Sequence, residues 1–173
     1  LPGGYEYTGE WVDGRIEGQG VARYPNGSVY EGEFVDGAPH GQGRIVYADG
    51  GSYDGEWRNG VIEGRGKAVY ADGVVYEGEF RNSAHHGQGV MTRPNGYRYE
   101  GGWKDGAPHG EGEVLYPDGA VYVGDFVDGT REGRGRLELA DGFVYEGAWS
   151  GGEMTGEGRA VYPNGDVYEG AFV

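Results

Sequence analysis

The chain has no cysteine and only 7 prolines among its 173 residues. Without cysteine it can form neither a disulfide scaffold nor a thiolate metal site. The few prolines, and the lack of glycine at every third residue, exclude a collagen triple helix. No run approaches the length of an apolar membrane-spanning helix. The chain opens Leu1-Pro2-Gly3-Gly4 without an initiator methionine or a signal-peptide pattern, which predicts a segment excised from a longer protein.

Basic residues are also scarce, with 14 Lys and Arg against 29 Asp and Glu, for a formal net charge of −15. Phosphate backbones and anionic lipid surfaces both attract basic patches, so neither nucleic-acid binding nor direct binding to anionic lipid is expected. Glycine, by contrast, is abundant at 40 residues, which argues strongly against an ordinary helical domain. The 15 Tyr, 5 Phe and 4 Trp are too many aromatic residues for a disordered chain.

A motif Tyr-x-Gly-x-(Trp/Phe) recurs every 23 residues without insertion or deletion, and its last ring alternates between Trp and Phe. Two further markers, Gly-x-Gly and (Pro/Ala)-(Asn/Asp)-Gly, share this period. No linker or change of composition interrupts it, so residues 1–173 are predicted to form one array of about 7.5 repeats. The motif begins at Tyr7, Tyr30, Tyr53, Tyr76, Tyr99, Tyr122, Tyr145 and Tyr168.

The (Pro/Ala)-(Asn/Asp)-Gly triplets are typical of β-hairpin loops, because Pro suits the first turn position and Gly the left-handed one. If Tyr24 pairs with Ser28 across such a turn, strand alternation places all the rings on one face. The positions that flank each turn support this register, since each pair holds one ring and never two. These pairs are Leu1/Tyr5, Tyr24/Ser28, Tyr47/Gly51, Tyr70/Val74, Arg93/Tyr97, Tyr116/Ala120, Leu139/Phe143 and Tyr162/Asp166.

The same register sets bases against acids on the other face, which is predicted to be a solvated outer surface. The pairs are Arg44/Asp54, Lys67/Glu77, Arg65/Glu79, Arg136/Glu146 and Arg159/Glu169. It also brings Gly20 opposite Gly32, and Gly43 opposite Gly55, leaving bare backbone that rings of the same or the next repeat can cover. The first Tyr of each motif is expected to be core, whereas the Trp/Phe rings and the turn-flanking Tyr are expected to be partly open.

Residues 30–50 nearly spell Tyr-Glu-Gly-Glu-Phe-x-x-Gly-x-x-His-Gly-x-Gly-x-x-x-Tyr-x-Asp-Gly. This pattern resembles the MORN (membrane occupation and recognition nexus) repeat, and the resemblance covers the whole chain. It implies an all-β fold: an elongated single-layer antiparallel sheet of stacked β-hairpins, forming a twisted rod with an aromatic groove. It also implies a scaffold or docking role. Departures from the pattern are Ser83, Arg93, Val123 and Leu139.

No constellation of residues breaks the repeat in the way that a catalytic site would. His40, His86 and His109 share one repeat position, so they point the same way and do not converge on one metal ion. Paired acids such as Glu77 and Glu79 recur in many copies on the charged face. Gly-x-Gly has no helix after it and fails as a phosphate loop. We therefore expect no enzyme activity, no catalytic residue, no cofactor and no metal.

The sequence favours a non-enzymatic scaffold that docks a protein partner, either an amphipathic helix or an extended peptide with basic flanks. Self-association is a related outcome. The alternatives are a membrane or phosphoinositide-targeting module of a larger protein, and an aromatic cage of the choline- or glucan-binding type. The expected location is cytoplasmic, or peripheral to a membrane or the cytoskeleton. The predicted groove residues are Tyr30, Phe34, Tyr47, Tyr53, Trp57, Tyr70, Tyr76, Phe80, Tyr99, Trp103, Tyr116, Phe126 and Trp149.

Overall fold

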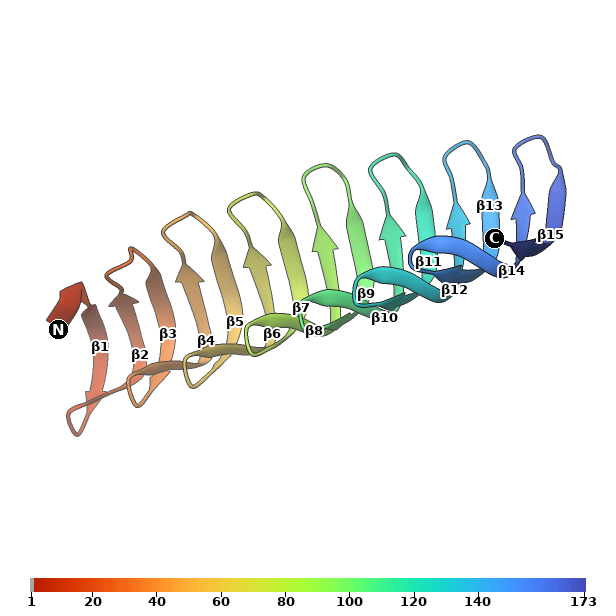
Figure 1. Cartoon of the computed structure of the whole chain (residues 1–173). Coiled ribbons are helices and arrows are strands. Elements are labelled where there is room, and N and C mark those ends of the chain that lie inside the picture. Colours follow the sequence, from red (N-terminus) through yellow and green to blue (C-terminus); the bar gives the residue numbers. More distant parts are fainter. Residues whose placement is uncertain (1) are drawn as a thin grey trace. The chain divides into compact units, whose positions relative to one another are not determined.

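The computed structural model describes residues 2–173, and it confirms the all-β prediction (Figure 1). After a short 3-10 turn at Pro2–Gly4, these residues form fifteen antiparallel strands in one open sheet, ordered as they occur in the chain. The strands are β1 (Glu6–Val12), β2 (Arg15–Arg23), β3 (Val29–Val35), β4 (Ala38–Val46), β5 (Ser52–Arg58), β6 (Val61–Val69), β7 (Val75–Arg81), β8 (Ala84–Thr92), β9 (Arg98–Lys104), β10 (Ala107–Leu115), β11 (Val121–Val127), β12 (Thr130–Glu138), β13 (Val144–Ser150), β14 (Glu153–Val161) and β15 (Val167–Phe172).

The chain divides into two compact units, Leu1–His85 and His86–Val173, which we call the N-terminal and C-terminal units. The N-terminal unit contains β1 to β7, and the C-terminal unit contains β9 to β15. Within each unit every strand lies beside the next one in the chain, joined by alternating long and short turns (Figure 1).

The predicted hairpin register is confirmed. Strand β2 pairs with β3 through Ala22↔Tyr30, Gly20↔Gly32 and Gly18↔Phe34. In the seven turn-flanking pairs from Tyr24/Ser28 onwards, the first residue's N–H donates to the second residue's carbonyl oxygen at 2.8–2.9 Å. The eighth pair, Leu1/Tyr5, includes a residue outside the described part of the chain. Local turn chemistry and the two-residue alternation together therefore set the register of the long turns.

The short turns between hairpins use left-handed backbone. Between β3 and β4, Asp36 and Gly37 have φ angles of 48° and 78°. This geometry matches the right-handed twist of the flanking strands, and Asp and Gly tolerate it better than most residues. Nearby, the β3–β4 register shifts between Gly32 and Phe34, which marks a β-bulge. At the equivalent bulge in another repeat, a carboxylate accepts a backbone hydrogen bond: the Gln19 N–H donates to Glu10 at 3.1 Å.

The core is a ladder of rings on one face of the sheet. Tyr30 is fully buried, and its ring meets those of Phe34 and Trp57 edge-on, with centroids 5.0 and 5.2 Å apart. Its hydroxyl donates to the carbonyl oxygen of Glu33 at 2.8 Å. A ring covers the bare backbone, as expected, but it comes from the preceding hairpin: a Cβ on Gly43 would overlap the Tyr30 ring. Each such tyrosine thus links its own motif ring to the next one along the unit.

The expectation that the Trp/Phe rings are partly open is wrong for most of them. Phe34, Trp57 and Phe80 in the N-terminal unit, and Trp103, Phe126 and Trp149 in the C-terminal unit, are all buried. Two contacts explain this burial at Trp57. Its ring packs edge-on against Tyr30 of the preceding motif, and its Nε1 donates to the Gly43 carbonyl oxygen at 2.9 Å.

The charged face has the predicted register, with Arg44 opposite Asp54 and Arg159 opposite Glu169. Arg159 and Glu169 form an ion pair at 3.0 Å, whereas Arg136 reaches Glu138 on its own strand at 3.0 Å. These side chains are about half exposed or more, so such pairs contribute little stability.

Candidate docking groove

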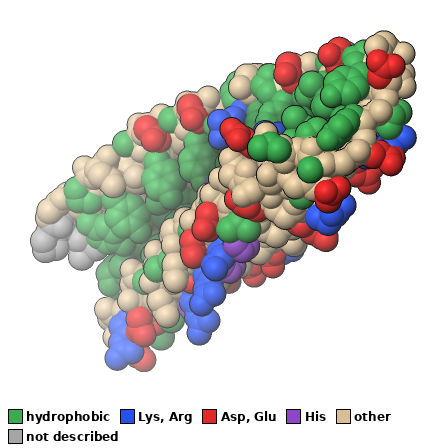
Figure 2. Space-filling model, turned by 45° about the vertical axis from the view of Figure 1, so that its right-hand side comes forward, with side chains coloured by type: hydrophobic (Ala, Val, Ile, Leu, Met, Phe, Trp, Pro, Cys, Tyr) green, Lys and Arg blue, Asp and Glu red, His purple; other side chains and the backbone are tan. Residues whose placement is uncertain are grey.

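The structure divides the thirteen predicted groove residues between core and surface. Ten are buried: Tyr30, Phe34, Tyr53, Trp57, Tyr76, Phe80, Tyr99, Trp103, Phe126 and Trp149. Three flank the long turns and remain accessible: Tyr47 is 37% exposed, Tyr70 is 42% exposed and Tyr116 is intermediate. Figure 2 shows hydrophobic side chains gathered on the hollowed face near the N-terminal end, with acidic side chains along its edge.

The N-terminal unit has a hollow of about 290 Å³ on this face, which we call the Tyr47–Tyr70 hollow. Tyr47 and Tyr70 form its accessible walls, and buried Tyr53, Phe80 and Ile62 also line it. Gly51 follows one long turn and lines the hollow too, adding no side chain to fill it. Its N–H donates to the Asp49 carboxylate at 2.8 Å.

One carboxylate, that of Asp49, lines this hollow beside the two tyrosine hydroxyl groups. Burial, with a contribution from Asp49, raises the pKa of Tyr47 above its usual value. Burial also raises the pKa of Tyr70, with smaller contributions from Tyr47 and Asp72. Both phenols are therefore neutral at physiological pH, where they offer hydroxyl donors and ring faces. The exposed Asp49 lines the hollow and carries a negative charge there.

One repeat position on this face was not recognised from the sequence as part of the aromatic surface. It lies opposite the Trp/Phe ring, as in the pairs Trp57↔Ile62 and Phe126↔Arg131. Unlike the motif residues, it changes chemistry from repeat to repeat, so no motif marks it. Its seven occupants are Ile16, Pro39, Ile62, His85, Pro108, Arg131 and Met154.

Arg131 is the cationic occupant of that position. Its Cζ lies 4.5 Å from the ring centre of Trp149, 5.5 Å from that of Tyr122 and 6.0 Å from that of Tyr116. Its Nη2 donates to the carbonyl oxygen of Gly152 at 3.0 Å. The aromatic face of the C-terminal unit thus holds a guanidinium through cation–π contacts and a backbone carbonyl.

His85 is the titratable occupant of the same position in the N-terminal unit. It is buried, its ring stacks on Tyr76 at 3.7 Å, and its Nε2 shares a hydrogen bond of 2.7 Å with the Tyr70 hydroxyl. Burial lowers the pKa of His85 to about 4. The contact with Tyr70 orients one wall of the Tyr47–Tyr70 hollow.

We expect the protein to lose stability as the pH falls from about 6.5 towards 4 because of His85. In this window the unfolded chain binds a proton at His85, whose ordinary pKa is about 6.5, while the folded chain keeps it neutral. The contribution is present above pH 6.5 and is progressively lost below it, by on the order of 2 kcal/mol. Urea unfolding at pH 7 and at pH 4.5 measures this loss.

The control is His85→Ile, which places at this position the residue that two other repeats carry, Ile16 and Ile62. Carboxylates titrate equally in both proteins, so the difference between their pH profiles isolates His85. Parallel profiles would contradict the assignment.

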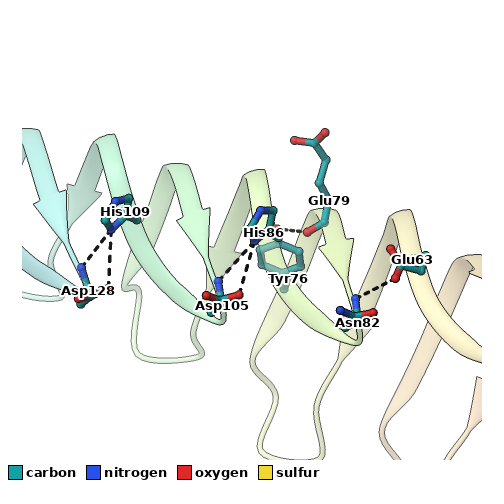
Figure 3. Close-up of polar contacts among 8 residues, drawn as sticks. All are labelled: Glu63, Tyr76, Glu79, Asn82, His86, Asp105, His109 and Asp128. Carbon is teal, nitrogen blue, oxygen red and sulfur yellow. Dashed lines mark hydrogen bonds and ion pairs between the residues drawn. The ribbon is translucent and has the colours of Figure 1, made fainter.

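The recurring histidines do not act as a group but connect successive repeats. The Asn59 N–H donates to Nδ1 of His40 at 3.2 Å, and the Asp128 N–H donates to Nδ1 of His109 at 3.3 Å. Glutamate does the same in other repeats, as when the Asn82 N–H donates to Glu63 at 3.1 Å (Figure 3). The residue at this repeat position therefore accepts a hydrogen bond from the next short turn along the chain.

Within residues 2–173, no group of three or more His, Cys, Asp or Glu side chains is placed to hold a metal ion. The described residues also include no helix with the length and apolar character needed to cross a bilayer.

Comparison with known families gives a repeated match. The family model described as the MORN repeat matches residues 7–29, 30–52, 53–75, 76–96, 99–121, 122–144 and 145–167. These matches follow the 23-residue period of the sequence. A search of curated protein sequences found no match.

Among solved structures, the chain is similar to domains of the protein CPAP. The Drosophila melanogaster SAS-4 (dCPAP) TCP domain, solved with a proline-rich motif of Ana2 (dSTIL), has a TM-score of 0.53 at 18% identity, covering 94% of each chain. The CPAP G-box domain has a TM-score of 0.48 at 18% identity, over 90% of this chain and 99% of that one. The Danio rerio CPAP TCP10 domain, with a STIL peptide, has a TM-score of 0.40 at 15% identity, over 97% and 89%. The likeness to the SAS-4 domain, at 18% identity, concerns the fold alone.

Proposed function

Because the chain belongs to the MORN repeat family, we propose that it is a non-enzymatic docking module that binds an extended segment of a protein partner on its aromatic face. The observation that carries this proposal is the Tyr47–Tyr70 hollow, where half-exposed tyrosines stand over a buried aromatic floor. Tyrosine is enriched at the centres of protein interfaces because it combines a large apolar surface with a hydroxyl. The solved SAS-4 domain of similar fold binds a peptide motif of another protein, which is consistent with this use of the fold.

The charge of the chain supports a basic partner. The net charge is −15, and acidic side chains lie along the edge of the hollowed face (Figure 2). Complementary charge accelerates association and disfavours acidic competitors. We propose a partner segment with apolar anchors for the rings and basic residues for the edge. The alternative is self-association, in which a second copy of the chain occupies the same face.

The double substitution Tyr47→Ser and Tyr70→Ser is expected to weaken binding of such a segment at least about tenfold, because it removes two aromatic anchors. The probe is a set of peptides selected from a random display library on the intact chain and measured by titration calorimetry. Light scattering of the same proteins tests self-association.

The control is Val35→Ser with Val61→Ser, which changes residues of similar exposure in the same unit, at 43% and 36%. Both lie on the opposite face of the sheet, one position along the strand from buried Phe34 and Ile62. Selected peptides should bind this control within about twofold of the native chain. Equal losses in both double variants, or none in either, would refute docking at the aromatic face.

A further inference from the structure

The aromatic surroundings of Arg131 recur three repeats earlier in the chain. The repeat period places Ile62 at the position equivalent to Arg131. The three rings around the Arg131 guanidinium belong to Tyr116, Tyr122 and Trp149. Their equivalents in the N-terminal unit are Tyr47, Tyr53 and Phe80, and all three line the Tyr47–Tyr70 hollow.

The N-terminal unit also has an equivalent of the backbone carbonyl that accepts the Arg131 hydrogen bond. Gly152, whose carbonyl accepts from Arg131, has Ser83 as its equivalent, and Ser83 lines the hollow. The Gly152 N–H donates to the Arg131 carbonyl at 3.0 Å, and the Ser83 N–H donates to the Ile62 carbonyl at 2.9 Å. The two turns therefore stand in the same relation to their strands.

The side chains explain why one site is filled and the other is open. The Arg131 side chain reaches from the rings to the Gly152 carbonyl, whereas the Ile62 side chain is shorter and can neither accept nor donate a hydrogen bond. In addition, Gly51 stands where the C-terminal unit has buried Ala120. The resulting space of about 290 Å³ lies at the small end of the range for ligand pockets, which suits one side chain.

We propose that the Tyr47–Tyr70 hollow is an arginine-binding subsite, in which a partner's guanidinium takes the place that Arg131 fills in the C-terminal unit. This inference rests on the proposed docking function and specifies the chemistry of the segment bound there. The ring faces of Tyr47, Tyr53 and Phe80 receive the planar cation, and the Ser83 carbonyl oxygen accepts a hydrogen bond from it. Asp49 at the same hollow supplies the complementary charge.

A planar guanidinium is favoured over the ammonium group of lysine. Arginine stacks on aromatic faces and is more weakly hydrated, so it loses less on leaving water. The reference contact in this chain is the Arg131 guanidinium carbon, which lies over the Trp149 ring at 4.5 Å from its centre. Lysine, proline and a second copy of the chain are the competing occupants.

The test uses the intact chain and three short probes, acetyl-Gly-Arg-Gly-amide and its Lys and Pro analogues. The arginine probe is expected to bind with a dissociation constant on the order of 1–10 mM, as befits a single partly buried contact. It should shift the NMR amide resonances of Gly51, Ser52 and Ala71, which line the hollow. It should bind at least about threefold more tightly than either analogue. No shift at these amides, or a tighter fit for lysine or proline, would overturn the proposal.

Two reciprocal variants test the subsite, one by filling the hollow and the other by emptying the equivalent site in the C-terminal unit. Ile62→Arg fills the hollow with the chain's own arginine and is expected to abolish the shifts. Arg131→Ile places the residue of two other repeats in the C-terminal unit and is expected to create a second site, with new shifts at Ala120 and Leu139. Unfolding curves establish that each variant is folded, and Arg131→Ile remains decisive if Ile62→Arg does not fold. Unchanged binding in both folded variants would refute the subsite.

Failure of this inference is distinguishable from failure of the proposed function. If Ile62→Arg still binds the display-selected peptides while Tyr47→Ser with Tyr70→Ser does not, docking at the aromatic face stands and the arginine subsite is wrong. If neither Ile62→Arg nor the double variant Tyr47→Ser with Tyr70→Ser alters peptide binding, both the arginine subsite and docking at the aromatic face are wrong.

Discussion

Replacing Gly43 with alanine is expected to lower the free energy of unfolding by about 3 kcal/mol or more. A Cβ at this position would overlap the hydroxyl and ring of Tyr30, which is fully buried. The ring cannot move aside, because Phe34 and Trp57 pack edge-on against it. Displacement would also break its hydrogen bond to the Glu33 carbonyl. Urea unfolding followed by circular dichroism measures the loss.

Gly50→Ala is the matched control in the adjacent turn. No atom lies within 4 Å of a Cβ there, although the φ angle of +91° is unfavourable for alanine. We expect a loss of about 1–2 kcal/mol from the backbone alone. In a Tyr30→Leu background, Gly43→Ala should cost less than in the native chain, since the overlapping ring is gone. Equal costs for Gly43→Ala in the two backgrounds would show that the ring is not the cause.

Trp57→Ala is expected to destabilise the protein by about 3–5 kcal/mol, the usual cost of truncating a buried tryptophan. The Trp57 side chain is 7% exposed, and its ring is 5.2 and 5.4 Å from those of Tyr30 and Tyr53. Its Nε1 also donates to the Gly43 carbonyl oxygen, and the substitution would remove this hydrogen bond. Thermal and urea unfolding should agree on the size of the loss.

Trp11 offers a control of the same residue type at the same repeat position. It is 53% exposed and its ring contacts that of Tyr7 at 5.4 Å. Trp11→Ala is expected to cost about 1 kcal/mol, because less apolar surface is lost from the interior. If Trp57→Ala leaves stability unchanged but abolishes binding of the selected peptides, Trp57 belongs to the docking surface and not to the core.

The sequence was sufficient for the backbone register because that register depends on short-range chemistry. The Tyr24–Ser28 turn follows from Pro25, Asn26 and Gly27, and the pairing of Gly20 with Gly32 follows from it by alternation. That rings cover the bare glycine backbone was also predictable, whereas the choice of Tyr30, from the preceding hairpin, to cover Gly43 was not. These features repeat every 23 residues, so each copy confirms the others.

The burial of individual rings was not predictable in the same way. Trp57 and Phe34 share a face with Tyr47 in the register, yet the first two are buried and Tyr47 is 37% exposed. The difference arises because a ring's exposure depends on the neighbouring repeat that packs against it. The links from His40 and Glu63 to the next short turn depend on the same inter-repeat geometry.

By itself, the sequence determined the all-β hairpin architecture, its register and the acidic character of the chain, because turn chemistry, alternation and charge are local or additive properties. Only the tertiary structure decided which aromatic residues form the core and which remain accessible. It also decided that Arg131 is held by rings while the equivalent site beside Ile62 is open. That distinction depends on the volume left between packed side chains, which the repeat pattern does not specify.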